Sequence, residues 1–599
     1  MTSMRGTKPL FTFAVVGDTH VNPRDDFSPS PWQTNKLANL RAQAVVAQIN
    51  ALEPDFVVHL GDMIHPLPGS TDYDEAAGRF REIFGALKMP LHVAPGNHDL
   101  GDKPTGWTPA AHVDQTALST YRGKFGDDHY AFEHADCRFL IVNDEIFNTG
   151  LAAEERQWQW LEKEMASKQR KFVFTHYPPF LQATDEVEHY DNLAEPGRTR
   201  FLDMLRDRAE AVYCGHVHNF FYNRIGATDL YVAPATSAVR HDYADMFSLA
   251  PEAETDHGRD QRSKLGFFLV EVYATHHVTH FIHSWGETDA ASASKDTSRP
   301  VASPIGDCSP IGVDLRVGWS DIHSVAFAGA VDEFNRKPVR NDYLILALWE
   351  LGMRHLRVPV RDLIEPNYAG RVRDLGSRGH RFTVFSYGLP NCAVQEQITA
   401  MSGFVEALEI TCRMEDLEDI AKKASDSTIA GNVPIFLSKL RLSADAAHDG
   451  NRFAHFIRHG FRVGEHDLAE AFDVVRNSAL TGLVFSIPEA VPASENIASI
   501  DQIAKNEQIC AHVHVQLAGE DPAVELTEET RTRGRVEEAA KAAWDASEKL
   551  RVILDTFCDH DRGYFPRIGL VDRRYDLRSA GKTLKRLVEE RAHANSAAH

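Results

Sequence analysis

Five short motifs place aspartate, asparagine and histidine side chains directly after apolar segments of the chain. Those segments are rich in β-branched and aromatic residues and predict buried strands. Because the carboxyl ends of such strands meet in one crevice of an open α/β sheet, we expect the motifs to form one ligand site. The motifs are Gly17-Asp18-Thr19-His20, Gly61-Asp62, Gly96-Asn97-His98-Asp99, Thr175-His176 and Gly215-His216-Val217-His218, and the segments before them are 11–16, 56–60, 91–94, 171–174 and 211–214.

The motifs offer carboxylate, amide and imidazole ligands and contain no thiolate. Such ligands suit Mn, Fe or Zn rather than an iron–sulfur cluster. Two metals about 3.5–4 Å apart require a shared ligand, and Asp62, which stands between two histidine-rich groups, is our candidate for it. A hydroxide held between two such metals attacks phosphorus in line, while the metals neutralise charge on the phosphate oxygens. The sequence therefore predicts a two-metal centre that hydrolyses a phosphate ester.

With these motifs in this order, the first half of the chain resembles the calcineurin-like metallophosphoesterases. The resemblance implies a four-layer α/β/β/α sandwich and supplies a ligand for every metal position. It also implies that His98 contacts the phosphate and protonates the leaving oxygen as a general acid. We expect Asp99 to accept the other ring proton of His98 and so fix its tautomer. The implied ligands are Asp18, His20 and His218 for one metal, Asn97, His176 and His216 for the other, and Asp62 as the bridge.

Each motif taken alone has a simpler interpretation. Asp, Asn and His are common in turns that follow strands, where they make local hydrogen bonds. A single Gly-Asp-x-His is therefore weak support for function, whereas the order and strand context of all the motifs favour a functional site. An inactive relative that has kept its ligands is also consistent with the sequence.

The loops that follow the ligand strands are expected to contact the organic part of the ester. The candidate substrate-binding residues are Asn97, Asn22, Arg24, Tyr177 and Arg240, and His65 and His241 lie in the same loops. Arg24 is preferred, because a guanidinium group pairs bidentately with phosphate. The simpler interpretation of each residue is a solvated loop side chain.

Length and composition limit the alternatives. A chain of 599 residues is too long for a single core and predicts two or three domains. The net charge of -22 argues against nucleic acid as the main partner, although a small phosphate ester is still attracted by the metals. The seven cysteines are scattered, which fits a reducing cytoplasm. The N-terminus is short and polar, and no apolar run is long enough to span a bilayer. We therefore expect a cytoplasmic protein that is not embedded in a membrane.

Changes in pattern along the chain predict an α/β protein of two domains. Alternating strands and helices indicate the phosphoesterase domain at 8–285, and a Ser-, Ala-, Asp- and Pro-rich stretch without periodicity indicates a linker at 286–310. A second domain follows at 311–590. Within the first domain we predict helices at 36–52, 73–87, 153–165 and 198–208 and hairpins at 130–144, 220–233 and 266–285.

The second domain repeats short apolar runs separated by helical stretches, which is the rhythm of a (β/α)8 TIM barrel. An acidic, Ala-rich stretch at 524–550 predicts one of its helices. An extra run at 311–317 is either a lead-in strand or a sign that one predicted strand is wrong. The predicted strands are 356–360, 382–387, 407–411, 433–437, 454–458, 483–487, 511–517 and 552–557.

The tail of this domain, at 559–573, weakly resembles the last strand and helix of glycoside-hydrolase-like barrels. A glycosidase needs two convergent carboxyl groups, which a barrel places at its strand ends. The candidate acids are Glu409, Glu489, Glu520 and Asp555. The Asn-Glu dipeptide common at the fourth strand of such hydrolases is absent from 433–441, and acids at strand ends commonly cap helices or pair with Arg. We therefore favour a structural or sugar-binding barrel.

The combined pattern predicts a metal-dependent phosphoesterase that acts on a small molecule. A phosphodiester is preferred to a phosphomonoester, because a histidine acid helps an alkoxide leaving group most. A sugar- or glycerol-containing ester would explain the glycosidase-like second domain, by analogy of fold alone. Two alternatives stay open: a catalytically silent binding or scaffold protein in which the metals are a structural staple, and a bifunctional enzyme with an independent glycosidase.

Overall fold

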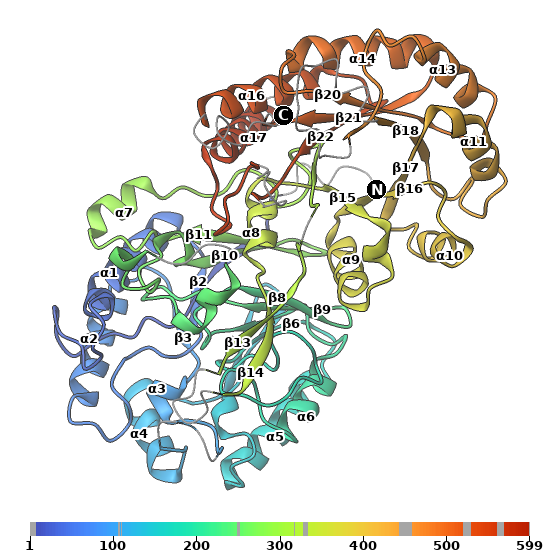
Figure 1. Ribbon diagram of the computed structural model, residues 1–599. Helices are drawn as coiled ribbons and strands as arrows, with labels where there is room; N and C mark the ends of the chain where they lie inside the picture. The colour runs from blue at the N-terminus through green and yellow to red at the C-terminus, as the bar shows by residue number, and fades with distance from the viewer. Residues whose placement is uncertain are drawn as a thin grey trace. The chain divides into compact units, whose positions relative to one another are not determined.

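The computed structural model describes residues 8–105, 108, 111–247, 252–316, 318–327, 334–441, 458–518, 529–559 and 568–597 of the chain. The chain divides into two compact units (Figure 1). The first comprises Met1–Pro300 and Ile322–Tyr343, and the second comprises Val301–Asp321 and Leu344–His599. The segment Ile322–Tyr343 falls inside the predicted second domain, yet it packs with the first unit.

Two sheets form the centre of the first unit. In one sheet the parallel strands β1, β2 and β3 are extended by antiparallel strands, in the order β11-β10-β1-β2-β3. The other sheet has the order β4-β5-β6-β7-β9-β8. The strands are β1 (Phe11–Val16), β2 (Phe56–His59), β3 (Leu91–Val93), β4 (Tyr130–His134), β5 (Cys137–Ile141), β6 (Arg170–Phe174), β7 (Ala211–Cys214), β8 (Phe221–Ile225), β9 (Thr228–Val232), β10 (Gly266–Val272) and β11 (His277–His283).

Aromatic side chains join the two sheets. Phe13 of β1 and Phe56 of β2 stack with ring centroids 5.2 Å apart, and both meet Phe139 of β5 edge-on, at 5.6 and 4.9 Å. All three rings are buried. Burying such a side chain contributes about 1.5–3 kcal/mol, so this contact strongly favours one pairing of the sheet faces. The four-layer order of the sandwich stays a prediction.

The first unit contains a helix that the sequence did not predict. The helix α7 (Ala290–Asp296) lies inside the predicted linker, 286–310, where the Asp289 side chain caps it by accepting a hydrogen bond from the Ala291 N–H (2.9 Å). It packs against α1, so part of this segment belongs to the folded unit. The other helices, which include the four predicted ones, are α1 (Ala38–Leu52), α2 (Tyr73–Phe84), α3 (Asn97–Leu100), α4 (Gln115–Phe125), α5 (Ala152–Met165) and α6 (Gly197–Leu205).

The second unit contains a closed barrel of eight parallel strands. Neighbours pair in the order β17-β16-β15-β12-β22-β21-β20-β18, and β18 pairs with β17 to close the ring. The strands are β12 (Ile311–Asp314), β15 (His355–Pro359), β16 (Arg381–Tyr387), β17 (Val405–Cys412), β18 (Ile435–Arg441), β20 (Gly482–Ile487), β21 (Cys510–Gln516) and β22 (Leu550–Asp555). The helices that alternate with them are α8 (Tyr343–Glu350), α9 (Pro366–Arg378), α10 (Cys392–Ala400), α11 (Leu417–Ser425), α13 (Leu468–Arg476), α14 (Ala493–Glu507), α16 (Glu529–Asp545) and α17 (Ser579–Ala597).

The ring closes with a strand other than one of those predicted. The run 311–317 supplies its first strand, β12, and the eight described strands close the ring without the predicted strand at 454–458. Of that segment the structure describes Arg458, which forms with His459 the short strand β19, antiparallel to β18. A short apolar run does not reveal from sequence alone whether it joins a ring or only its edge. Three of the predicted features of this domain lie partly outside the described residues. They are the predicted strand (454–457), the candidate acid Glu520 and the tail (560–567).

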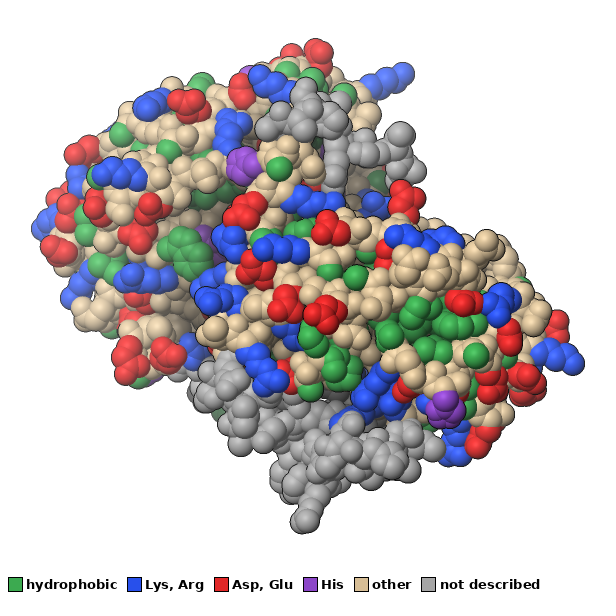
Figure 2. Space-filling model, turned by 90° about the horizontal axis from the view of Figure 1, so that it is seen from above, with side chains coloured by type: hydrophobic (Ala, Val, Ile, Leu, Met, Phe, Trp, Pro, Cys, Tyr) green, Lys and Arg blue, Asp and Glu red, His purple; other side chains and the backbone are tan. Residues whose placement is uncertain are grey.

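The surface carries charges of both signs. Figure 2 shows acidic and basic side chains interspersed over one face, which agrees with a chain whose net charge is -22 although it holds 64 Lys and Arg residues. None of the described helices combines the length and the apolar character needed to cross a membrane.

Candidate metal centre

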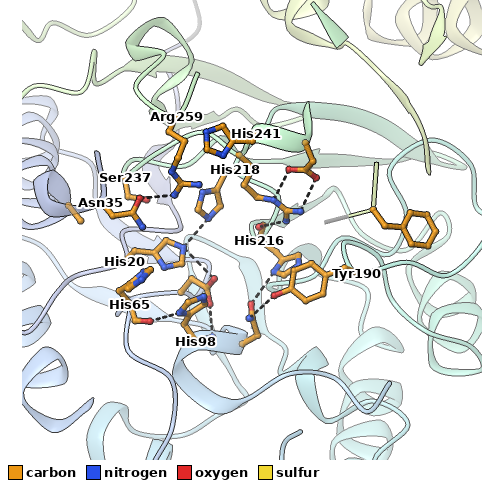
Figure 3. Close-up of a pocket in the computed structure, with 16 residues that line it drawn as sticks. His20, Asn35, His65, His98, Tyr190, His216, His218, Ser237, His241 and Arg259 are labelled. Atoms are coloured by element: carbon orange, nitrogen blue, oxygen red, sulfur yellow. Dashed lines mark hydrogen bonds and ion pairs between the residues drawn. The ribbon is translucent and has the colours of Figure 1, made fainter. Parts of the chain in front are cut away.

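The predicted ligand motifs meet at strand ends from both sheets of the first unit. Asp18 and His20 follow β1, Asp62 follows β2, Asn97 opens α3 after β3, His176 follows β6, and His216 and His218 follow β7. All of these side chains are buried. Figure 3 shows His20, His98, His216 and His218 around one pocket. The parallel direction of the strands within each sheet explains why their carboxyl ends, and hence the motifs, converge.

One group of ligand atoms comes from Asp18, His20, Asp62 and His218, and these atoms lie within 4.8 Å of one another. The Nε2 atoms of His20 and His218 are 2.9 Å apart, and His218 Nε2 is 3.4 Å from Asp18 Oδ1. The Asp62 Oδ2 atom lies 3.5 Å from His20 Nε2. These side chains provide the donor atoms for one cation.

A second group comes from Asp62, His176 and His216, within the same 4.8 Å limit, and Asn97 joins it. The Asn97 Oδ1 atom lies 3.1 Å from His176 Nε2 and 3.0 Å from His216 Nδ1. The Asp62 Oδ1 atom lies 3.3 Å from His176 Nε2. The structure thus brings together the residues expected for both metals and turns one Asp62 oxygen toward each group.

Backbone carbonyl groups orient two of the imidazole rings. His218 Nδ1 donates to the Ala238 carbonyl (2.8 Å), and His176 Nδ1 donates to the Leu60 carbonyl (2.9 Å). Because the Nδ1 atoms carry the protons in these bonds, each Nε2 atom keeps a lone pair directed at its ligand group. This is the arrangement that metal-binding histidines require.

The charges and unpaired atoms of the site also fit bound cations. Burial lowers the pKa values of His20 and His216 well below their usual value, so both rings are neutral ligands. Burial opposes the charged form of Asp62, but its histidine neighbours, His176 first, outweigh burial and hold the Asp62 pKa well below its usual range. Asp18 Oδ2 is buried without a hydrogen-bond partner among the described residues. A buried carboxylate oxygen of this kind, beside neutral imidazoles, fits a divalent cation.

The backbone of the motifs is strained. Asp18, His20, Asp62, His216 and His218 have φ angles of 54°, 45°, 49°, 68° and 54°. Such left-handed angles are uncommon outside glycine and cluster at ligand-binding sites. Glycines let the turns approach closely, because a Cβ on Gly96 would collide with the backbone nitrogen and carboxylate of Asp62, and one on Gly215 would lie 2.8 Å from Asp18 Oδ2.

His98 lies beside both ligand groups. Its backbone N–H donates to Asp62 Oδ1 (2.8 Å), and its Nδ1 atom donates to the His65 carbonyl (2.5 Å). Its ring centroid is 4.6 Å from that of His20. The bond to the carbonyl fixes the tautomer and leaves Nε2 as the ring atom free for a substrate.

The predicted role of Asp99 is wrong. Among the described residues its carboxylate bonds not the His98 ring but the backbone N–H groups of Met63 (3.1 Å) and Gly96 (3.0 Å). As the third residue of α3, Asp99 points back to the start of the helix, as in a capping box. It therefore ties the turn after β2 to the turn after β3. Burial and the nearby charge of Asp62 raise the pKa of Asp99 to about 8.

A cavity of about 420 Å³ opens beside the ligand groups (Figure 3). Of the predicted substrate-binding residues, Asn97 and Arg240 line it, together with His65 and His241. The lining residues that the sequence did not predict include Asn35, Tyr190, Ser237, Asp242, Arg259 and Phe327.

The structure corrects three of the predicted substrate contacts. Asn22 is buried and donates to the Asn35 carbonyl (2.7 Å), so it stabilises its own loop. Tyr177 is buried with its ring centroid 4.1 Å from that of His216 and supports this ligand from outside the cavity. Arg24 is exposed and is not among the residues that line the cavity. Proximity in sequence to a ligand therefore does not fix which way a loop side chain points.

Arg240 is neutralised by a buried charge cluster. Its guanidinium pairs with Asp191 (2.6 Å) and Asp242 (3.0 Å), and the fully buried Lys337 pairs with the same two carboxylates. Asp191 Oδ1 also lies 3.7 Å from His216 Nε2. Lys337 belongs to the hairpin of β13 (Ile322–Ala326) and β14 (Arg336–Arg340). A hairpin encoded between the first two barrel strands therefore completes the wall of the metal centre.

Apart from Arg240, sequence reasoning missed the residues of this wall, because none stands in a strand-end motif. The Tyr190 hydroxyl accepts a hydrogen bond from Asn97 Nδ2 (3.3 Å), and its ring centroid is 4.8 Å from that of His216. The polar run His189-Tyr190-Asp191-Asn192 after β6 is the one local signal that pointed to this position. Lys337 has no local signal, because only the fold brings the hairpin to the site.

The three candidate acids at the barrel strand ends that the structure describes are ion-paired. Glu409 is fully buried and accepts hydrogen bonds from Arg357 (2.6 Å), His512 (2.7 Å) and His514 (3.1 Å). The other pairs are Asp555 with Arg316 and Glu489 with Arg531. These contacts favour the simpler interpretation, in which carboxylates at strand ends pair with arginine.

Residues 11–220 match the family model described as calcineurin-like phosphoesterase. The N-terminal region is a calcineurin-like metallophosphoesterase domain. Serine/threonine-protein phosphatase CPPED1 of Mus musculus is 32% identical to this chain over 192 residues, which cover 30% of this chain and 58% of that protein. CPPED1 of Homo sapiens is 31% identical to this chain over 193 residues, which cover 30% of this chain and 58% of that protein. Glycerophosphodiester phosphodiesterase GpdQ of Enterobacter lignolyticus is 28% identical over 244 residues, 37% of this chain and 76% of that protein. This chain thus spans little more than half the length of the CPPED1 proteins that it matches.

We expect Asp62→Asn to lower the metal content from about two to below one per chain, because both ligand groups lose a charged oxygen. Elemental analysis after reconstitution with Mn measures the content. Asp127→Asn removes an exposed carboxylate of the same unit and should leave the content unchanged. An Asp62→Asn protein that retains the full metal content would contradict the shared role of this carboxylate.

We expect Lys337→Met to lower the free energy of unfolding of the first unit by about 3–5 kcal/mol, because Asp191 and Asp242 would then share one buried cation. Urea unfolding followed by hydrogen exchange of first-unit peptides measures this change. The matched control is Lys168→Met, which removes an exposed ammonium group. A loss no larger than that of the control would show that the cluster does not need its second cation.

Proposed function

We propose that this protein is a metal-dependent phosphoesterase that hydrolyses small-molecule phosphodiesters. The observation that carries the proposal is the Asp62 carboxylate, which turns Oδ2 toward His20 (3.5 Å) and Oδ1 toward His176 (3.3 Å) within two buried ligand groups. A carboxylate shared in this way supports a dinuclear metal site, and Mn, Fe and Zn are the metals that suit its ligands.

The side chains of this site would hold the cations and orient the ester. When bound, two such cations neutralise charge on the phosphate oxygens and bring the pKa of a bound water to about 7. The proposed ligands are Asp18, His20 and His218 for one cation, Asn97, His176 and His216 for the other, and Asp62 for both. Tyr190 accepts the Asn97 Nδ2–H, which leaves Asn97 Oδ1 directed at His176 and His216.

His98 is positioned to act as the general acid. The His65 carbonyl holds its Nδ1 atom, and Asp62 holds its backbone N–H, so the ring presents Nε2 to the cavity that it lines. A protonated Nε2 donates to the oxygen of the departing alcohol. Such proton donation contributes about 10²–10⁴-fold, and most for a poor leaving group such as an alkoxide. The arrangement therefore supports esters of simple alcohols.

The cavity and the relatives support the proposed substrate class. A volume of about 420 Å³ suits a small ligand. GpdQ is named a glycerophosphodiester phosphodiesterase, and this supports a glycerol- or sugar-containing diester. The second candidate function is phosphoprotein phosphatase activity, which the 32% identity to the serine/threonine-protein phosphatase CPPED1 favours. In both cases the partner is a phosphate ester, not nucleic acid or membrane, and scattered cysteines support a cytoplasmic location.

The second unit is assigned a structural or sugar-binding role as a (β/α)8 barrel. A glycosidase needs one carboxyl group that is protonated and a second that is charged beside the scissile bond. Arg357, His512 and His514 instead hold the pKa of the fully buried Glu409 well below its usual range, although burial opposes this. A carboxylate held charged by three partners is suited to fixing the barrel interior rather than to proton donation.

We expect the Mn-reconstituted protein to hydrolyse glycerophosphodiesters and His98→Ala to lower kcat by about 10²–10⁴-fold. On bis(p-nitrophenyl) phosphate the loss should be smaller, because nitrophenolate leaves without a proton. Released alcohol and nitrophenol measure the two rates. His466→Ala, an exposed histidine of the second unit, is the matched control.

Metal content of the His98→Ala protein separates catalysis from metal loss, and we expect it to be unchanged. Equal losses on the two leaving groups would contradict the general-acid role. Metal binding without hydrolysis of any monoester or diester, phosphopeptides included, would support the catalytically silent scaffold instead.

A further inference from the structure

One guanidinium group of the cavity plays no part in the metal chemistry. Arg259 lies beside His241 and His218, on the other side of His20 from His98 (Figure 3). Its Nη2 atom donates to Asn35 Oδ1 (2.7 Å), and its guanidinium carbon lies 5.8 Å from the centroid of the Trp32 ring. These contacts hold the group in place at the cavity wall.

Arg259 has no carboxylate partner among the described residues, and its buried Nε atom has no hydrogen-bond partner there. The two acids whose charges act on Arg259 hold other partners in direct contact. Asp242 pairs with Arg240 and Lys337. Asp256 accepts hydrogen bonds from the backbone N–H (3.0 Å) and hydroxyl (2.8 Å) of Thr34.

Burial opposes the charge of Arg259, and Asp256 and Asp242 stabilise it only from beyond ion-pair distance. A largely buried guanidinium with no carboxylate in direct contact is costly unless a ligand supplies one. Burial lowers the pKa of Arg259 to about 10, so the group still carries its charge at neutral pH. Its planar fork of N–H donors matches the two oxygens of a carboxylate or a phosphate. The neighbouring Arg240 differs, because two carboxylates neutralise it.

The position of Arg259 relative to His98 indicates which part of the substrate Arg259 contacts. The scissile phosphate must lie between the two ligand groups and within reach of His98 for the proposed reaction. Arg259 faces the cavity from the opposite side of His20 (Figure 3). Arg259 is therefore placed to contact a part of the substrate other than the scissile phosphate.

We propose that Arg259 is a specificity-determining residue that binds a second anionic group of the substrate, a carboxylate. The proposal rests on the proposed function for the scissile phosphate and narrows its substrate class to phosphate esters that carry another negative charge. Asn35 orients the guanidinium, and Trp32 covers its face.

Calorimetric titration of the Mn-loaded protein tests this without turnover. The probes are phosphonoacetate, 3-phosphonopropionate and 4-phosphonobutyrate, each compared with the alkylphosphonate of equal length. Because one charge-assisted bidentate pair is added, we expect at least one carboxylated probe to bind about tenfold more tightly than its neutral counterpart. Arg259→Met should abolish this preference and leave the affinity for the alkylphosphonate unchanged, and Arg24→Met, an exposed arginine outside the cavity, should retain it.

A second variant protects the test against misfolding of Arg259→Met. Asn35→Asp places a carboxylate on Arg259 Nη2 and should also abolish the preference while the metal content stays unchanged. Equal affinities for all pairs in the unmodified protein would overturn the proposal, and so would a preference that survives both variants. A parallel loss for both probe types in Arg259→Met would also overturn it, since the residue would then bind the scissile group.

The outcome is separable from that of the proposed function. A preference for carboxylated probes in a protein that hydrolyses no ester would overturn the phosphoesterase and leave the anion site standing. Hydrolysis of esters without any preference for carboxylated probes would overturn the anion site and leave the phosphoesterase standing.

Discussion

The shared Asp62 carboxylate is the interaction on which the metal centre depends. One oxygen faces His20, and the other faces His176 and accepts the His98 N–H, so both ligand groups and the proposed acid meet at one side chain. Asp62 reaches this position in a left-handed conformation, with Gly96 packed against it. Asp99 then ties the two turns together through backbone N–H groups. A buried carboxylate in such a place needs positive charge, which bound cations would supply.

The proposed metal ligands and part of the cavity wall come from different parts of the chain. Every proposed metal ligand lies between residues 18 and 218, inside the matched family segment 11–220. The wall of the cavity includes Arg240, Arg259 and Phe327, which lie beyond that segment. Lys337 of β14 balances the charge behind Arg240, so the first unit is complete only with a hairpin encoded after the first barrel strand.

The sequence predicted those features that local structure determines. A strand followed directly by Gly-Asp or Gly-His puts the ligand at the strand end, and β1 and β7 have the predicted bounds. The orientation of Asp99 escaped prediction, because it depends on how α3 begins against the neighbouring turn. Arg24 and Asn22 failed as substrate contacts because a loop side chain can turn either way after a ligand. Lys337 and Arg259 could not be found, since only tertiary packing carries them to the cavity.

Electron paramagnetic resonance of the protein loaded with Mn(II) tests the shared carboxylate most directly. A bridging ligand couples the spins of two metal ions held about 3.5–4 Å apart. The account predicts an exchange-coupled dinuclear spectrum at full loading. A spectrum of isolated Mn(II) ions at full loading would contradict the shared-carboxylate centre.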